Sequence, residues 1–173
     1  MKSLLAIDPG SSSGAIAYRS ALGTVGVLNM PDSMEGIWNL LRMDPAETDW
    51  TGSIGCGVVV EDVGGSMPGN AAKSARTFAA HVGALHMALI AADHWSYTQL
   101  VRPQVWMKDL FGTLLPKAPK GADAATKAAV KKERKAYIYA QTQVWMPTLK
   151  FTLRQADAVA MLWWLMKKEE GQL

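Results

Sequence analysis

Three acidic residues stand where predicted secondary-structure elements meet. Asp8 ends a short apolar strand, Glu61 ends another apolar strand, and Asp157 begins the last helix. If the two strands are parallel neighbours in one sheet, Asp8 and Glu61 lie side by side at the strands' carboxyl ends, where ligands of open α/β sheets collect. Carboxylates at short range repel one another and do not stay ionised without a cation. The spacing therefore indicates a carboxylate cluster that binds cations.

Hard divalent cations such as Mg²⁺ or Mn²⁺ relieve this repulsion, because they prefer oxygen ligands. Two such ions about 3.5–4 Å apart can stabilise the attacking and the leaving oxygen in phosphodiester hydrolysis. Each acid also has a plain structural interpretation. Asp8 can cap the turn at Pro9 and Gly10, and Asp157 can favour a helix dipole near an N-terminus. The basic second half of the chain, described next, favours the metal-binding interpretation of the three acids over the structural one.

The formal net charge of +3 hides an asymmetry. Residues 1–62 carry 3 basic against 8 acidic side chains, whereas residues 63–173 carry 15 basic against 7 acidic ones. A basic half suggests a polyanion as partner. An ordinary solvated surface is the alternative interpretation.

The elements that must position these acids predict an α/β domain. The 173 residues suit one domain, residues 1–173, with a core of its own. Short turns between the first three strands favour an antiparallel meander, and the later strands alternate with helices. We therefore expect a mixed five-stranded sheet with helices on both faces. Strands are predicted at 3–8, 14–18, 24–30, 57–61 and 97–101, and helices after Ser33 and at 71–92, 103–111, 124–146 and 155–168.

Composition narrows the class of protein. The chain is 49% hydrophobic and 19% charged, which is a globular composition. The single cysteine, Cys56, excludes a disulfide framework within the chain and suggests a reducing compartment. No apolar run approaches the roughly 18 residues that a membrane span needs. We expect a cytoplasmic protein without a membrane partner.

The segment 8–14, with its acid, glycines and serines, also resembles the first phosphate loop of actin-like and sugar-kinase ATPases. Those proteins need two such domains around the nucleotide, which 173 residues cannot supply. We therefore expect no nucleotide cofactor.

Five motifs in order resemble RuvC-type Holliday-junction resolvases, in particular their phage and prophage members. Each motif is weak alone, but together they run through most of the chain. They are the opening 5–11 with Gly14, the second acidic strand 58–63, the loop and helix start 67–78, the Pro-Gln-x-Trp segment 101–108, and the final Ala-Asp-Ala at 156–158.

The resemblance implies a ribonuclease H-like fold and a homodimer. It implies an endonuclease that nicks two symmetric strands of a four-way DNA junction, using two Mg²⁺ or Mn²⁺ ions and water as nucleophile. Asp8, Glu61 and Asp157 would be metal ligands. Lys108 and Lys135 lie where the family places basic residues near the scissile phosphate.

Basic residues of the second half would contact the DNA backbone, a sequence-independent and salt-sensitive interaction. A solvated helix face is the alternative interpretation of this stretch. Met67 is the candidate for an apolar wedge in the junction, against simple loop packing. The candidate DNA contacts are Lys73, Arg76, Lys117, Lys120, Lys127, Lys131, Lys132, Arg134 and Arg154.

The sequence departs from the family at the fourth metal ligand. The family has an acid or histidine three residues before the last aspartate, where this chain has Arg154. We expect Arg154 to lie close to Asp157. Either Asp62 or Gln155 replaces the missing ligand, or one metal site is weakened. Asp62 can join the cluster only if it lies just past the strand's end, because adjacent strand residues face opposite sides.

Three alternatives remain at this stage. A protein that binds junctions without cutting them would explain the incomplete ligand set. A related nuclease could act on flaps, or on RNA–DNA hybrids.

Trp163 and Trp164 are candidates for the contact between two protomers.

Overall fold

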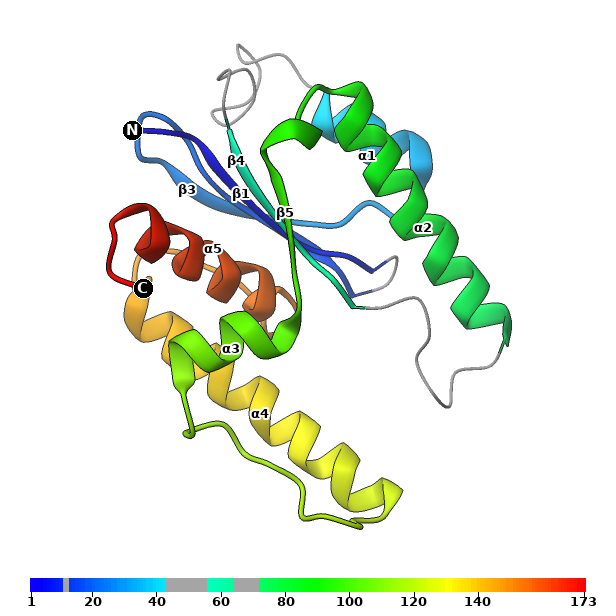
Figure 1. The fold of residues 1–173 in the computed structure, drawn as a ribbon, viewed down its shortest axis with the longest axis vertical. Helices are drawn as coiled ribbons and strands as arrows, with labels where there is room; N and C mark the ends of the chain where they lie inside the picture. The colour runs from blue at the N-terminus through cyan, green and yellow to red at the C-terminus, as the bar shows by residue number, and fades with distance from the viewer. Residues whose placement is uncertain (11–12, 43–55, 64–71) are drawn as a thin grey trace.

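A computed structural model describes residues 1–10, 13–42, 56–63 and 72–173 (Figure 1). Within these ranges the chain forms one five-stranded sheet and five α-helices. The strands are β1 (Leu4–Asp8), β2 (Ala15–Arg19), β3 (Val25–Asn29), β4 (Gly57–Glu61) and β5 (Thr98–Val101). The helices are α1 (Met34–Leu41), α2 (Ala72–Ala91), α3 (Pro103–Phe111), α4 (Ala124–Trp145) and α5 (Ala156–Glu169), with 3-10 turns η1 (Trp95–Tyr97) and η2 (Leu153–Gln155).

The sheet has the strand order β3-β2-β1-β4-β5. β1, β2 and β3 form an antiparallel meander, and β4 and β5 extend the sheet as strands parallel to β1. Ile7 pairs with Val60, so the next residues along, Asp8 and Glu61, end neighbouring strands at the same edge. The predicted mixed sheet is confirmed, and the two acid-ended strands are parallel neighbours, which is the condition under which Asp8 and Glu61 were expected to lie side by side.

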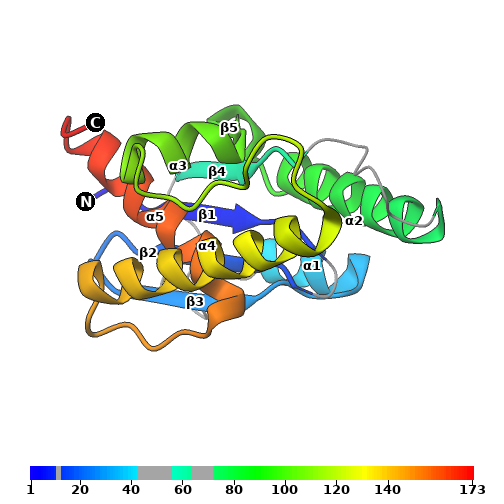
Figure 2. The ribbon, with the colours of Figure 1, turned by 90° about the horizontal axis from the view of Figure 1, so that it is seen from below.

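Helices cover both faces of the sheet, as predicted (Figures 1 and 2). α1 and α2 lie on one face, and α3, α4 and α5 lie on the other. Successive side chains of β1 point to opposite faces of the sheet, so this strand contributes to the core on each face. Leu5 and Ile7 join the core under α1 and α2, whereas Leu4 and Ala6 join the core under α5. β1 and β4 are therefore buried from both sides.

Helix ends follow local chemistry. Ser33 caps α1 by accepting a hydrogen bond from the Gly36 backbone N–H at 3.0 Å. Asp123 caps α4 by accepting one from the Thr126 N–H at 2.7 Å. The predicted strand 97–101 begins one residue later, because Tyr97 closes the 3-10 turn η1.

The last helix is buried nearly all round, as its apolar sequence indicates. It packs against β1, β2 and α4. Trp164 is fully buried within the protomer, so its proposed role in a dimer contact is wrong. Trp163 is half-buried and stacks on Trp145 of α4 with 5.9 Å between ring centroids.

No helix among the described residues is both long enough and apolar enough to cross a membrane.

Candidate active site

Asp8 ends β1, and the chain returns as β2 directly beside it. The Gly14 backbone N–H donates to the Gly10 carbonyl at 2.8 Å, and Asp8 pairs with Ala15 across the two strands. A Cβ atom on Gly14 would lie 2.6 Å from the Asp8 carbonyl oxygen, which is too close for any side chain. Glycine at position 14 therefore lets the chain reverse directly beside the acid.

Glu61 is the last residue of β4 and is only 8% exposed. Its Oε1 accepts a hydrogen bond of 2.9 Å from the indole Nε1 of Trp106 on α3. Val101 of β5 pairs with Glu61, and Pro103 starts α3 immediately afterwards. Proline suits the first turn of a helix, so the short connection carries Trp106 back over the end of β4.

Asp157 lies in the first turn of α5, and its two carboxylate oxygens differ. Oδ2 forms an ion pair with the ammonium of Lys135 on α4. Oδ1 is buried and finds no hydrogen-bond partner among the described residues. Lys135 also donates to the Arg154 carbonyl at 3.4 Å, so α4 is tied to the segment that leads into α5.

The electrostatics show that the three acids share one environment. Burial, followed by the charges of Glu61 and Asp157, raises the pKa of Asp8 well above its usual value. Burial and the charge of Asp157 raise the pKa of Glu61 from 4.5 to about 7. The Trp106 hydrogen bond and the charge of Lys135 act in the opposite direction on the pKa of Glu61. The charges of the three acids that the sequence singled out therefore act on one another, and Lys135, which the resemblance also singled out, acts on two of them.

These acids suit a hard divalent cation by their chemistry. They offer carboxylate oxygens, they repel one another, and Oδ1 of Asp157 is buried without a partner. Among the residues that the structure describes, however, no three acid, histidine or cysteine side chains converge closely enough to hold a metal ion. Lys135 supplies the positive charge beside Asp157 instead.

The structure does not bring the other candidate ligands into this cluster. Asp62 follows β4, and its Oδ2 lies 3.9 Å from Nε of Arg102, because adjacent residues of an extended chain face opposite sides. Gln155 uses both ends of its amide elsewhere: Oε1 accepts from the Thr152 N–H at 2.9 Å, and Nε2 donates to Asn29 at 3.1 Å.

Two predicted basic residues also lie apart from the acids. The side chain of Arg154 is exposed, and Lys135, not Arg154, pairs with Asp157. Lys108 is exposed on α3, two positions after Trp106. Side chains two positions apart on a helix point in different directions, so the turn that aims Trp106 at Glu61 aims Lys108 away.

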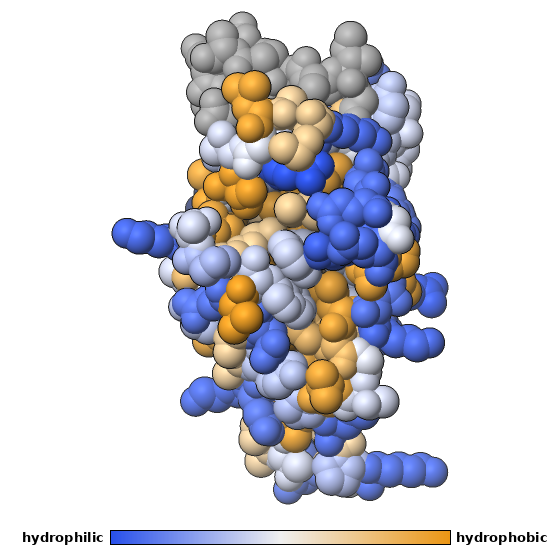
Figure 3. Space-filling model, turned by 90° about the vertical axis from the view of Figure 1, so that its left-hand side faces the viewer, coloured by the Kyte–Doolittle hydropathy of each residue, from blue (hydrophilic) through white to orange (hydrophobic). Residues whose placement is uncertain are grey.

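The other candidate DNA contacts lie mostly on and before α4. Arg134 is half-buried, and its Nη2 donates to the Pro116 carbonyl at 3.0 Å, so it fixes the preceding segment to the helix. Met67 lies outside the described residues, and for Lys73 only the backbone in α2 is described. Hydrophilic side chains project from the lower half of the face in Figure 3, at the level of α4 in Figure 1. The exposed candidates are Arg76, Lys117, Lys120, Lys127, Lys131 and Lys132.

Sequence reasoning missed the contact between Trp106 and Glu61. The segment 101–108 contributes the Pro-Gln-x-Trp pattern and Lys108 to the resemblance, but the sequence assigns no role in the site to Trp106 itself. A signal was present, since a buried tryptophan needs an acceptor for its indole N–H. The sequence does not show which acceptor that is.

Comparisons with known proteins bear on the fold. No family model and no curated protein matches the sequence. The Thermus thermophilus RuvC structure matches with a TM-score of 0.53 and 13% identity, covering 98% of this chain and 97% of that chain. T. thermophilus RuvC in complex with Holliday junction substrate matches with a TM-score of 0.60 and 12% identity, covering 99% and 98%. The chain has a RuvC-like fold. The likeness to RuvC extends over nearly the whole of both chains, so the ribonuclease H-like fold expected from the motifs is confirmed.

Proposed function

We propose that residues 1–173 form one ribonuclease H-like nuclease domain that resolves four-way DNA junctions by metal-dependent hydrolysis. It would act in the cytoplasm of a bacterial or phage-infected cell. The observation that carries the proposal is the gathering of Asp8, Glu61 and Asp157 from β1, β4 and α5 in one buried environment. The RuvC-like fold supports it, since one of the similar structures is RuvC in complex with Holliday junction substrate.

Asp8, Glu61 and Asp157 would hold Mg²⁺ or Mn²⁺, two ions per site in our proposal. A bound ion of this kind supplies Lewis-acid chemistry and a water nucleophile for phosphodiester hydrolysis. Trp106 donates to Glu61 and so fixes one oxygen of that carboxylate. Lys135 lies against Asp157, and its ammonium would donate to a phosphate oxygen of DNA that enters the site.

A stripe of lysines on α4 gives the DNA a path to this site. Lys127, Lys131 and Lys135 follow one another at intervals of four residues, so they lie on the same face of the helix, about 6 Å apart. Lys127 and Lys131 are exposed, and Lys135 ends the stripe at the acid cluster. A phosphate backbone that follows the stripe would therefore reach the acids.

Symmetric cleavage, as proposed, would require a homodimer. The described chain holds one acid cluster, and a single cluster can cut one strand at a time. A four-way junction with two equivalent cuts requires two such sites related by a two-fold axis, which a closed pair of identical protomers supplies. We therefore propose a homodimer that nicks both strands.

A synthetic four-way junction incubated with Mg²⁺ or Mn²⁺ tests the proposal, with duplex, flap and RNA–DNA hybrid of the same sequences as controls. We expect paired nicks in the junction and little cutting of the controls. Preferred cutting of a flap or a hybrid would show the related nuclease instead.

Binding of the junction without cleavage would show the second candidate function, a non-cleaving junction-binding protein. The ion pair of Lys135 with Asp157 favours this candidate, because it occupies one acid of the cluster.

Mixed dimers of wild type and Asp157→Asn test whether each protomer of the proposed homodimer makes one of the two cuts. We expect one nick per junction from the mixed dimer and two from the wild type.

The lysine path has its own test. The double variant Lys127→Gln/Lys131→Gln should weaken binding to any DNA and flatten the dependence of log K on log salt by roughly 0.9 per lost phosphate contact. Lys150→Gln/Lys168→Gln removes the same charge away from the stripe and is the matched control. Equal salt slopes for the two double variants would contradict the path.

A further inference from the structure

Trp106 is fully buried on α3, and its indole N–H reaches the acid cluster. Nε1 donates to Oε1 of Glu61 at 2.9 Å. The ring also meets Phe111 edge-on, with centroids 6.4 Å apart. Full burial in the core leaves the indole few rotamers, so packing helps to fix the direction of its N–H.

A buried tryptophan needs some acceptor for its N–H, and the choice of acceptor here is informative. A backbone carbonyl would satisfy the indole equally well. The acceptor in this structure is instead a carboxylate that interacts electrostatically with two other acids, Asp8 and Asp157. Hydrogen bonds to an ionised group are shorter and stronger than neutral ones, and low exposure strengthens them further.

We propose that Trp106 is a positioning residue for Glu61. The indole holds Oε1 and thereby commits Oε2 as the oxygen that a cation can bind. The inference rests on the proposed function, in which Glu61 is a cation ligand. Carboxylate ligands held by such an outer hydrogen bond lose about 10–100-fold in metal affinity or activity when that bond is removed.

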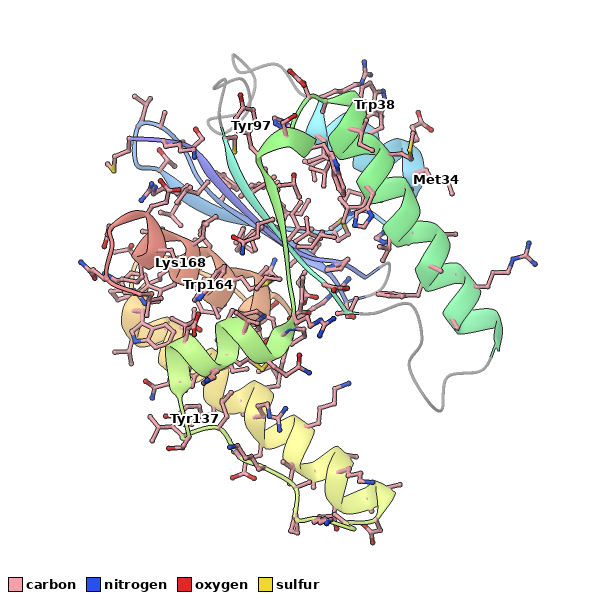
Figure 4. All side chains as sticks on the ribbon, viewed as in Figure 1. Met34, Trp38, Tyr97, Tyr137, Trp164 and Lys168 are labelled. Atoms are coloured by element: carbon pink, nitrogen blue, oxygen red, sulfur yellow. The ribbon has the colours of Figure 1, made fainter. Side chains whose placement is uncertain are left out.

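The chain contains a matched control for this bond. Trp164 on α5 is also fully buried, and its Nε1 donates to Oδ2 of Asp109 at the same distance of 2.9 Å. Figure 4 labels Trp164 and the neighbouring Lys168, whose ammonium lies 4.6 Å from the ring centroid. Trp164 is seven residues after Asp157 on the same helix, about 10 Å along its axis. Asp109 is exposed and is not among the groups that shift the pKa values of the acid cluster.

Calorimetric titration with Mn²⁺ compares Trp106→Phe with Trp164→Phe in the full chain. Both changes keep an aromatic ring and remove one indole–carboxylate bond. We expect Trp106→Phe to bind Mn²⁺ about 10–100-fold more weakly and to lower kcat on a four-way junction with KM unchanged. We expect Trp164→Phe to bind Mn²⁺ as the wild type does. Equal Mn²⁺ affinity in the two variants would overturn the proposal.

A second measurement uses the wild type and does not depend on a variant folding well. Proton–nitrogen NMR gives one indole signal for each of the seven tryptophans. The Trp106 signal is assigned by its loss in Trp106→Phe or, if that variant does not fold, by the contact of its indole N–H with the side chain of Glu61. We expect it to move as Mg²⁺ is added while the Trp164 signal stays. A Trp106 signal that stays still during saturation with Mg²⁺ would overturn the positioning role.

The outcomes distinguish failure of the proposed function from failure of the role of Trp106. A wild type that neither binds Mn²⁺ nor cuts junctions would overturn the proposed function, and the role of Trp106 with it. A wild type that binds and cuts, beside a Trp106→Phe variant that does both equally well, would overturn the role of Trp106 alone.

Discussion

The crowding of buried acids predicts that the protein without metal becomes less stable as the pH rises. The pKa of Glu61 is raised from 4.5 to about 7 in the folded protein, mainly by burial. Between these two values the folded state binds the proton and the unfolded state has lost it. The stabilising contribution is therefore fully present below pH 4.5 and is lost as the pH rises through about 7.

The size of the effect follows from the same shift. A rise from 4.5 to about 7 in a residue that is 8% exposed corresponds to about 3 kcal/mol of unfolding free energy. For a chain of this length, each kcal/mol moves Tm by roughly 2–4 °C, so the change in Tm is about 6–12 °C. Asp8, whose pKa is raised mainly by burial as well, acts in the same direction.

The assay is thermal unfolding from pH 5 to pH 8.5, for wild type and Glu61→Gln, with chelator or with Mg²⁺. The comparison with Glu61→Gln is needed because burial lowers the pKa values of His86 and His94, which makes stability rise with pH up to about 6.5. Without metal, we expect the wild type to lose stability relative to Glu61→Gln as the pH rises. With Mg²⁺, we expect this loss to disappear, because a cation that binds only the folded carboxylates stabilises them.

Two results would refute the reasoning. A difference in Tm between wild type and Glu61→Gln that stays constant over this pH range would show that Glu61 is ionised throughout. A gain in Tm with Mg²⁺ that is as large at pH 5 as at pH 8 would show that the ion binds elsewhere, because protons compete for the carboxylates at low pH.

Three further predictions concern single side chains. Asp8→Asn, Glu61→Gln and Asp157→Asn should each abolish junction cleavage while gel-shift affinity for the junction stays near that of wild type; full cleavage by all three would show that the site lies elsewhere. Lys135→Met should lower the unfolding free energy by about 1–3 kcal/mol without metal, because it leaves a buried carboxylate unpaired, and Mg²⁺ should restore it in the same melting experiment. Asp62→Asn should cut junctions at nearly the wild-type rate, because its carboxylate pairs outside the cluster; a clearly slower rate would return it to the ligand set.

Local sequence was sufficient for the elements that carry the acids. The run of valines before Glu61 predicts a central strand, and the structure has it at Gly57–Glu61. Pro103 predicts the start of α3, and the helix runs from Pro103 to Phe111 as expected. Because parallel strands end at one edge, the proximity of Asp8 and Glu61 could be predicted on the condition that their strands are parallel neighbours, which the structure shows.

The partners of the acids could not be predicted in the same way. Arg154 was expected beside Asp157 because one helical turn separates them, yet Lys135, 22 residues earlier in the chain, forms the ion pair. Trp106 reaches Glu61 across 45 residues, and Arg134 reaches the Pro116 carbonyl across 18. Such contacts depend on how α3, α4 and α5 pack on the sheet, which spacing along the sequence does not specify.

The acid cluster is held in place by apolar packing and not by its own charges. β1 and β4 are buried from both faces, so the carboxylates at their ends cannot separate to relieve their repulsion. Protons, Lys135 or an added cation remain as sources of relief. Protons become scarce above pH 7, and Lys135 brings one positive charge to three acids. In the proposed function a divalent cation supplies the remaining positive charge, so metal binding and the loss of stability with pH should have the same origin.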